Sequence, residues 1–208
     1  RPRAALASCA AVLVLLGIAT AVRVQAWHTP LAFATQSTLD APRSERAWSN
    51  LCRTHFEASD SNPGNAEFDA AVEACQAGAD LGYGASTLAS LIVLKTIRGD
   101  ATPTDWNSLY ARMRRVTMTP SNLGVAWYLV RYSNGDNRID ARRVMPVLDI
   151  VTQRTHFRPD EYAVFGYYAA KHALDADAYR YFEQAVRNSP PGNPVPAALI
   201  ADLRAEGR

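Results

Sequence analysis

The feature that most constrains this chain is a run of nineteen uncharged residues, Ala4–Val22, near the start of its 208 residues. At ~1.5 Å per helical residue, the run reaches about the hydrocarbon thickness of a bilayer. Arginines precede the run, and Arg23 and Trp27 follow it, where guanidinium and indole groups suit the headgroup layer. The sequence therefore predicts a transmembrane helix within residues 1–27. A cleaved signal peptide and a buried soluble helix are the alternatives.

Composition excludes one large class of partner. The chain has 22 basic and 20 acidic residues, and its net charge is +2. A nucleic-acid binder needs a basic footprint, whereas the only local clusters are Arg114–Arg115 and Arg142–Arg143, which are typical of solvated helix faces. We therefore expect no nucleic-acid partner. Apolar residues make up 48% of the chain, which is enough for a folded core.

Beyond the apolar run, hydrophobic residues recur at helical spacing, and no segment alternates with period two for long enough to be a strand. Ser44 and Thr102 are placed to cap helices, and Pro146 should kink or shorten the helix that contains it. The predicted fold class is all-α. We expect an amphipathic linker or helix over 28–43, about four helix pairs over 44–190, and a capping helix over 191–208.

The last predicted helix pair carries the clearest pattern, and its spacings resemble the tetratricopeptide repeat. In that repeat, small residues let two helices approach, and a large aromatic residue fills the groove beside them. The earlier pairs are more degenerate. The resemblance implies a tetratricopeptide-like helical-hairpin solenoid. The matching positions are Tyr162, Phe165, Gly166, Ala169, Ala178, Phe182, Ala185 and Pro190.

The junction between the apolar run and the first pair resembles a second family. It is similar to the passage from the last transmembrane helix into the tetratricopeptide domain of multi-pass, protein O-mannosyltransferase-like glycosyltransferases. The resemblance implies that the repeats lie on the non-cytoplasmic side. That family's catalytic carboxylates lie in a membrane-core loop with no counterpart here, so no catalytic residue is carried over. The residues concerned are Arg23, Trp27, Leu31, Pro42, Arg46, Trp48 and Leu51.

No catalytic, metal or cofactor site is predicted from motifs. The chain has no GxGxxG, Walker or HExxH pattern. His172 with Asp175 and Asp177 is interpreted as a polar turn rather than a metal cluster. Cys52 lies three residues before His55, but both occupy core positions of the repeat pattern, which argues against an activated thiolate. Likewise, "NGDNRID" is interpreted as a turn whose Asp140 caps the next helix.

The three cysteines have different expected fates. Cys9 lies in the apolar run and should be a free thiol. Cys52 and Cys75 occupy positions that face each other within a tetratricopeptide unit, so a disulfide is predicted between them. Two reduced core cysteines are the alternative.

These features together predict a membrane-tethered domain that binds a protein or peptide in a concave groove. The alternative is an acceptor-presenting C-terminal domain of a membrane glycosyltransferase whose catalytic core lies outside this chain, which begins at Arg1. A structural role in an envelope complex is a third possibility. We expect the bacterial inner membrane, contact with lipid through residues 4–22, and a periplasmic soluble domain. The candidate partner-binding residues are Trp127, Tyr128, Arg131, Tyr167 and Lys171.

Overall fold

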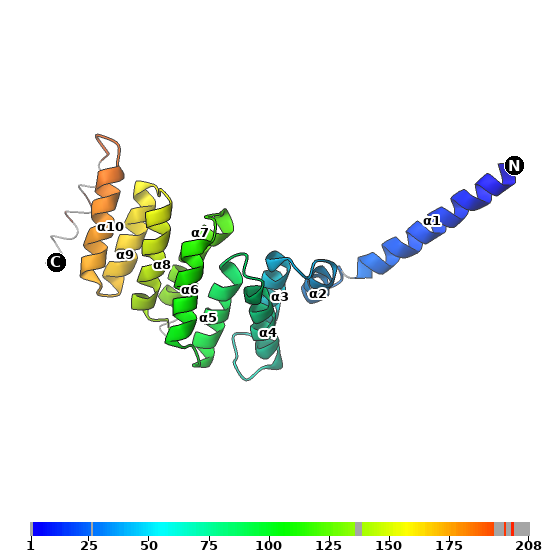
Figure 1. Cartoon of the computed structure of the whole chain (residues 1–208), viewed down its shortest axis with the longest axis horizontal. Helices are drawn as coiled ribbons and strands as arrows, with labels where there is room; N and C mark the ends of the chain where they lie inside the picture. Colours follow the sequence, from blue (N-terminus) through cyan, green and yellow to red (C-terminus); the bar gives the residue numbers. More distant parts are fainter. Residues whose placement is uncertain (1, 26, 136–138, 194–197, 199–200, 202–208) are drawn as a thin grey trace. The chain divides into compact units, whose positions relative to one another are not determined.

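All the regular secondary structure that the model describes is α-helical (Figure 1). The computed structural model describes residues 2–25, 27–135, 139–193, 198 and 201, and over these residues it contains helices and turns without strands. The predicted all-α class is therefore confirmed. The helices group into two compact units, Arg1–Leu81 and Gly82–Arg208. This division falls inside the array of helix pairs predicted over 44–190.

The first unit contains four helices: α1 (Pro2–Gln25), α2 (Pro30–Asp40), α3 (Glu45–Ala58) and α4 (Ala66–Asp80). Ser44 caps α3 as predicted, because its hydroxyl accepts a hydrogen bond from the backbone N–H of Ala47. Helices α3 and α4 form a hairpin around Phe68, which is fully buried. Ala34 and Thr38 of α2 are also buried, where α2 packs against α3.

Helix α1 differs from the expectation for a membrane span. Over the part of the chain that the structure describes, no helix combines the length and the apolar character needed to cross a bilayer. The transmembrane helix predicted over Ala4–Val22 is therefore not found. Side chains are described continuously only over residues 10–21 of this helix, which is about 18 Å of helix against a hydrocarbon core of ~30 Å.

The second unit contains three consecutive helix pairs. They are α5 (Ser86–Arg98) with α6 (Pro103–Arg115), α7 (Pro120–Gly135) with α8 (Ala141–Arg154), and α9 (Pro159–Lys171) with α10 (Asp175–Asn188). The caps predicted at Thr102 and Asp140 are confirmed: Thr102 accepts from the N–H of Asp105, and Asp140 accepts from the N–H of Arg142. Gly99 ends α5 with a φ of 91°, a left-handed conformation that suits glycine.

Equivalent helices of successive pairs are neighbours within this unit. The first helices of the pairs form one layer, in which α7 packs against α5. Helix α7 also contacts α9, because the Tyr168 hydroxyl of α9 donates to Ser133 Oγ of α7 at 2.8 Å. In the other layer, α8 contacts α6 and α10. There, Arg154 of α8 donates to the carbonyls of Met113 and Val116 at the end of α6, at 2.6 and 2.8 Å. The second unit is therefore a two-layered stack of hairpins.

Two expectations about the last helices have different outcomes. Pro146 does not shorten α8, which continues through it from Ala141 to Arg154. Proline removes the N–H that would bond to the carbonyl four residues earlier, which here belongs to Arg142. The next carbonyl, that of Arg143, accepts from the Tyr110 hydroxyl at 2.7 Å, so this turn of α8 is tied to α6. The capping helix expected over 191–208 falls almost entirely outside the described residues.

Candidate functional site

Two of the five candidate partner-binding residues pack against neighbouring helices. Trp127 of α7 is half-buried, and its ring lies against Phe165 of α9 with centroids 4.7 Å apart. The Tyr128 ring packs against that of Tyr132 on the same helix, also with centroids 4.7 Å apart, and its hydroxyl forms a hydrogen bond with Ser90 of α5. Burial of that hydroxyl raises the pKa of Tyr128. These two side chains hold α7 to its neighbours.

The other three candidates are exposed. Arg131 lies on α7, and Tyr167 and Lys171 lie on α9. Tyr167 is 50% exposed while one edge of its ring packs against Phe182 of α10, with centroids 5.1 Å apart. A partner could therefore reach these side chains without unfolding any helix.

Sequence reasoning missed two further exposed apolar side chains on the last pair. Val164 of α9 is 44% exposed, and Tyr179 of α10 is 41% exposed. Val164, Tyr167 and Lys171 recur at intervals of three and four residues, so they share one side of α9. We refer to these three residues as the α9 stripe. Their spacing was visible in the sequence, but the tetratricopeptide pattern does not say which of its variable positions face solvent.

A charged cluster joins α8 to α10 and was also not anticipated. Asp149 Oδ1 accepts hydrogen bonds from Arg180 Nη1 at 2.6 Å and from the Tyr181 hydroxyl at 2.7 Å. Arg180 also donates to Asp177 at 2.6 Å. Burial raises the pKa of Tyr181, and the adjacent Asp149 carboxylate adds to this shift. The groups satisfy one another, so the cluster serves as a structural tie between hairpins.

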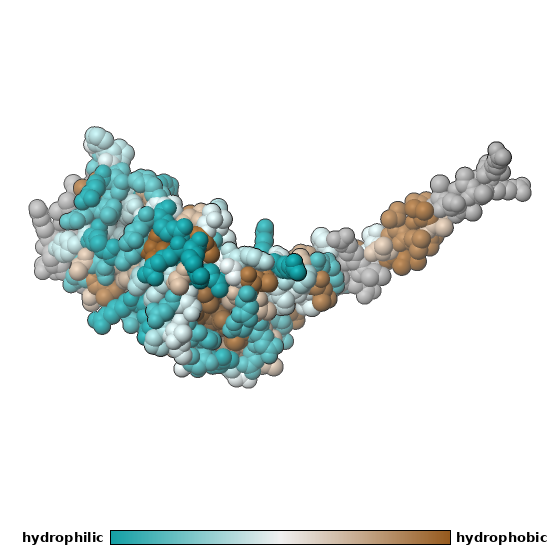
Figure 2. Space-filling model, in the orientation of Figure 1, coloured by the Kyte–Doolittle hydropathy of each residue, from teal (hydrophilic) through white to brown (hydrophobic). Residues whose placement is uncertain are grey.

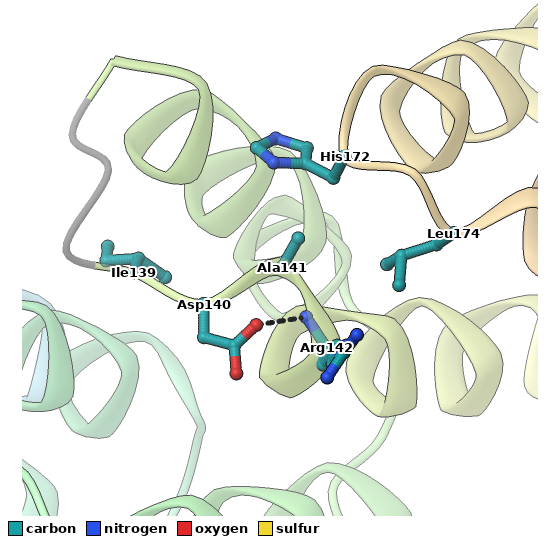
Figure 3. A pocket seen from close by; sticks show the side chains of 6 residues that line it. All are labelled: Ile139, Asp140, Ala141, Arg142, His172 and Leu174. Atoms are coloured by element: carbon teal, nitrogen blue, oxygen red, sulfur yellow. Dashed lines mark hydrogen bonds between the residues drawn. The ribbon is translucent and has the colours of Figure 1, made fainter.

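One pocket of about 310 Å³ lies beside the turns that precede α8 and α10 (Figure 3). Its floor includes the backbone at the start of α8, where the Asp140 carboxylate accepts from the N–H of Arg142. His172 faces it from the end of α9. The described lining residues are Ile139, Asp140, Ala141, Arg142, His172 and Leu174.

The chemistry of this pocket is limited. Burial lowers the pKa of His172 and the nearby Lys171 lowers it further, whereas Asp140 opposes the shift. The imidazole is therefore neutral at pH 7. Its Nε2 atom is buried without a hydrogen-bond partner among the described residues, and no hydrogen bond joins His172 to Asp140. Among the described lining residues, therefore, no general acid and base are paired by a hydrogen bond.

Cys52, Cys75 and His55 of the first unit are engaged in structural contacts. Cys52 of α3 and Cys75 of α4 form a disulfide with Cα atoms 5.1 Å apart. His55 Nδ1 lies 2.6 Å from a carboxylate oxygen of Glu67, so this pair also links α3 to α4. The side chain of Cys9 falls outside the described side chains. A disulfide-bonded Cys52 cannot act as a thiolate beside His55.

Metal binding receives no support from the described part of the chain. No group of three or more His, Cys, Asp or Glu side chains there is arranged to hold a metal ion. Asp175 and Asp177 lie in the first turn of α10, where carboxylates favour the helix N-terminus. These two carboxylates of the considered metal cluster therefore have a structural role in starting α10, whereas His172 lies at the end of α9.

Comparison of the chain with family models, with curated proteins and with solved structures found no match. The likeness to tetratricopeptide repeats and to O-mannosyltransferase-like glycosyltransferases thus stays a prediction from sequence.

Proposed function

We propose that the second unit is a tetratricopeptide-like domain that binds a protein or peptide partner. The main supporting observation is the stack of hairpins whose first helices carry exposed Arg131 and the α9 stripe. Gly166 packs against Phe182, which agrees with the role of these positions in the repeat pattern. Stacked hairpins bind partners across several repeats at once, which suits an extended peptide.

The types of side chain at Arg131 and along the α9 stripe also support partner binding at this surface. Tyrosine and arginine are enriched among the residues that dominate binding energy, because they combine apolar area with hydrogen-bonding groups. Tyr167 is already held against Phe182, so a partner would order a side chain that has little freedom left to lose. Arg131 and Lys171 would favour partners with acidic side chains.

Random peptides displayed on phage would test this proposal. We expect selection on the purified chain to enrich peptides that bind wild type about tenfold or more tightly than the Arg131→Ala/Tyr167→Ala/Lys171→Ala variant. Arg187, an exposed residue at the end of α10, supplies the matched control as Arg187→Ala. Circular dichroism would verify that both variants fold. Enriched peptides that bind all three proteins equally would contradict this binding surface.

We also propose that a lipid bilayer covers the exposed apolar part of α1. Residues 10–21 are all exposed and none is charged. The large side chains point in every direction around the helix axis and are 54–69% exposed; they are Val12, Leu13, Val14, Leu15, Leu16 and Ile18. Figure 2 shows this stretch as hydrophobic over the face in view. A groove on a protein would cover one side only, whereas lipid surrounds the whole helix.

Charges placed on α1 should remove this attachment. Each charge in the hydrocarbon costs about 3 kcal/mol, so Leu13→Glu/Leu16→Glu should shift the chain from the membrane to the soluble fraction after carbonate extraction. The control is Tyr83→Glu at a residue of the second unit that is 68% exposed, and it should not change the distribution. Wild type in the soluble fraction would contradict lipid attachment.

The disulfide also supports a proposal about the compartment. Cystine bridges persist in oxidising compartments such as the bacterial periplasm and are rare in the cytosol. The Cys52–Cys75 bridge therefore supports the proposal that α3, α4 and the second unit lie on the non-cytoplasmic side of the membrane.

A further inference from the structure

An exposed aromatic pair lies directly after α1. Trp27 and Phe33 pack edge to face with ring centroids 5.6 Å apart. They are nevertheless 69% and 45% exposed, so their mutual contact covers only part of their surface. Thr29 caps α2 by accepting from the N–H of Ala32, and Pro30 occupies the first turn. The backbone that carries the pair is therefore ordered by local bonds.

The aromatic pair is not part of the protein core. Helix α2 buries Ala34 and Thr38 where it packs against α3, and Phe33 lies off this buried side, 45% exposed. Trp48 offers an internal comparison, because it is half-buried and its indole N–H donates to the carbonyl of Pro42 at 2.9 Å. The Trp27 indole has no such acceptor among the described residues. The apolar ring of Trp27 and its indole N–H can therefore both contact molecules outside this chain.

We infer that Trp27 and Phe33 lie in the headgroup layer of the bilayer and orient the first unit on the membrane surface. This inference rests on the proposed lipid contact of α1. Helix α1 ends at Gln25, and two residues of chain span at most ~7 Å. A bilayer that covers α1 therefore brings Trp27 to its polar edge. Tryptophan favours that layer because its ring is apolar while its N–H can donate to lipid oxygens.

Charge agrees with a lipid partner. The sequence contains no acidic residue before Asp40, so no carboxylate close to Trp27 along the chain would be repelled by anionic headgroups. Arg43 and Arg46, in the connection to α3 and at its start, are exposed cations. The aromatic pair also orients α2 relative to the bilayer. The side of α2 with exposed Phe33 faces lipid, and the side with Ala34 and Thr38 faces α3. The disulfide-linked hairpin then lies on the aqueous side.

Quenching of tryptophan fluorescence by brominated lipids would test the inference. The full chain would be reconstituted in vesicles of phosphatidylcholine and phosphatidylglycerol brominated at either a shallow or a deep acyl position. We expect the shallow lipid to quench wild type more than the deep lipid, and Trp27→Phe to lose most of that quenching. Trp48→Phe is the matched control and should keep it. Phe33→Ala should weaken the quenching, because it removes the ring against which Trp27 is held.

The outcomes separate this inference from the proposed lipid attachment. Vesicle flotation reports attachment through α1, whereas the loss of quenching in Trp27→Phe reports the position of the aromatic pair. Flotation with equal quenching of wild type and Trp27→Phe would overturn the inference and leave the attachment in place. Failure to float would overturn both. A contact of Trp27 with a protein partner or a second copy would likewise leave the indole unquenched and overturn the inference.

Discussion

Removing the disulfide by Cys52→Ala/Cys75→Ala should destabilise the α3–α4 hairpin by ~3 kcal/mol. The bridge closes a loop with a sequence separation of 23 residues, and the chain-entropy model assigns about this free energy to a loop of that size. Both cysteines are buried, at 2% and 0% exposure, so two smaller side chains also lose some packing. Because ~1.4 kcal/mol is a factor of ten, hydrogen-exchange protection of the α3 and α4 amides should fall more than a hundredfold.

Reduction of wild type provides the control for this prediction. A reductant should lower the protection of wild type toward that of the double variant, and it should not affect the variant. Amides of α9 and α10 in the second unit have no bridge between them and should be unchanged in both proteins. Thiol labelling of the denatured, unreduced chain should find one reactive cysteine. Three reactive cysteines would show that the bridge does not form.

The helical class could be predicted from sequence because it depends on local signals. The caps at Ser44, Thr102 and Asp140 are bonds between residues only two or three positions apart, and the structure confirms each of them. Spacing of apolar residues likewise reports which side of a helix is buried. These features need no knowledge of how distant segments meet.

Contacts between hairpins could not be predicted in the same way. The tie from Asp149 to Arg180 and Tyr181 crosses more than thirty residues, and neither helix contains a local sign that its polar groups will meet. The burial of Tyr128 beside Ser90 is a similar case. An aromatic residue on a helix serves equally well as packing or as a binding surface, and the neighbouring helix decides which.

The length of the apolar run alone did not settle the assignment of α1. The nineteen uncharged residues matched the thickness of a bilayer, but the structure contains no helix that meets the criterion for crossing one over the residues that it describes. Residues 10–21 are all exposed, so this part of α1 does not pack into a hydrophobic core with the rest of the protein. The sequence identifies the apolar segment. What covers that segment depends on molecules other than this chain.

Adding a single methyl group at Gly166 should destabilise the α9–α10 pair by about 2 kcal/mol. A Cβ atom there would lie 2.7–2.9 Å from three ring carbons of Phe182. Phe182 is only 3% exposed and also packs against Tyr167, so its ring has little room to move. Overpacking of this kind costs about 1–3 kcal/mol, which exceeds the gain of up to ~1 kcal/mol that alanine brings to a helix.

Gly124 of α7 makes the test of Gly166 decisive, because it is also a helical glycine of the second unit. A Cβ atom at Gly124 would meet nothing within 4 Å, so Gly124→Ala should stabilise the unit by up to ~1 kcal/mol. The two substitutions are chemically identical and should act in opposite directions in urea unfolding. Phe182→Leu combined with Gly166→Ala should cost less than the sum of the single changes, since the smaller side chain makes room for the methyl group. Equal effects of Gly166→Ala and Gly124→Ala would show that close approach of Phe182 does not require glycine.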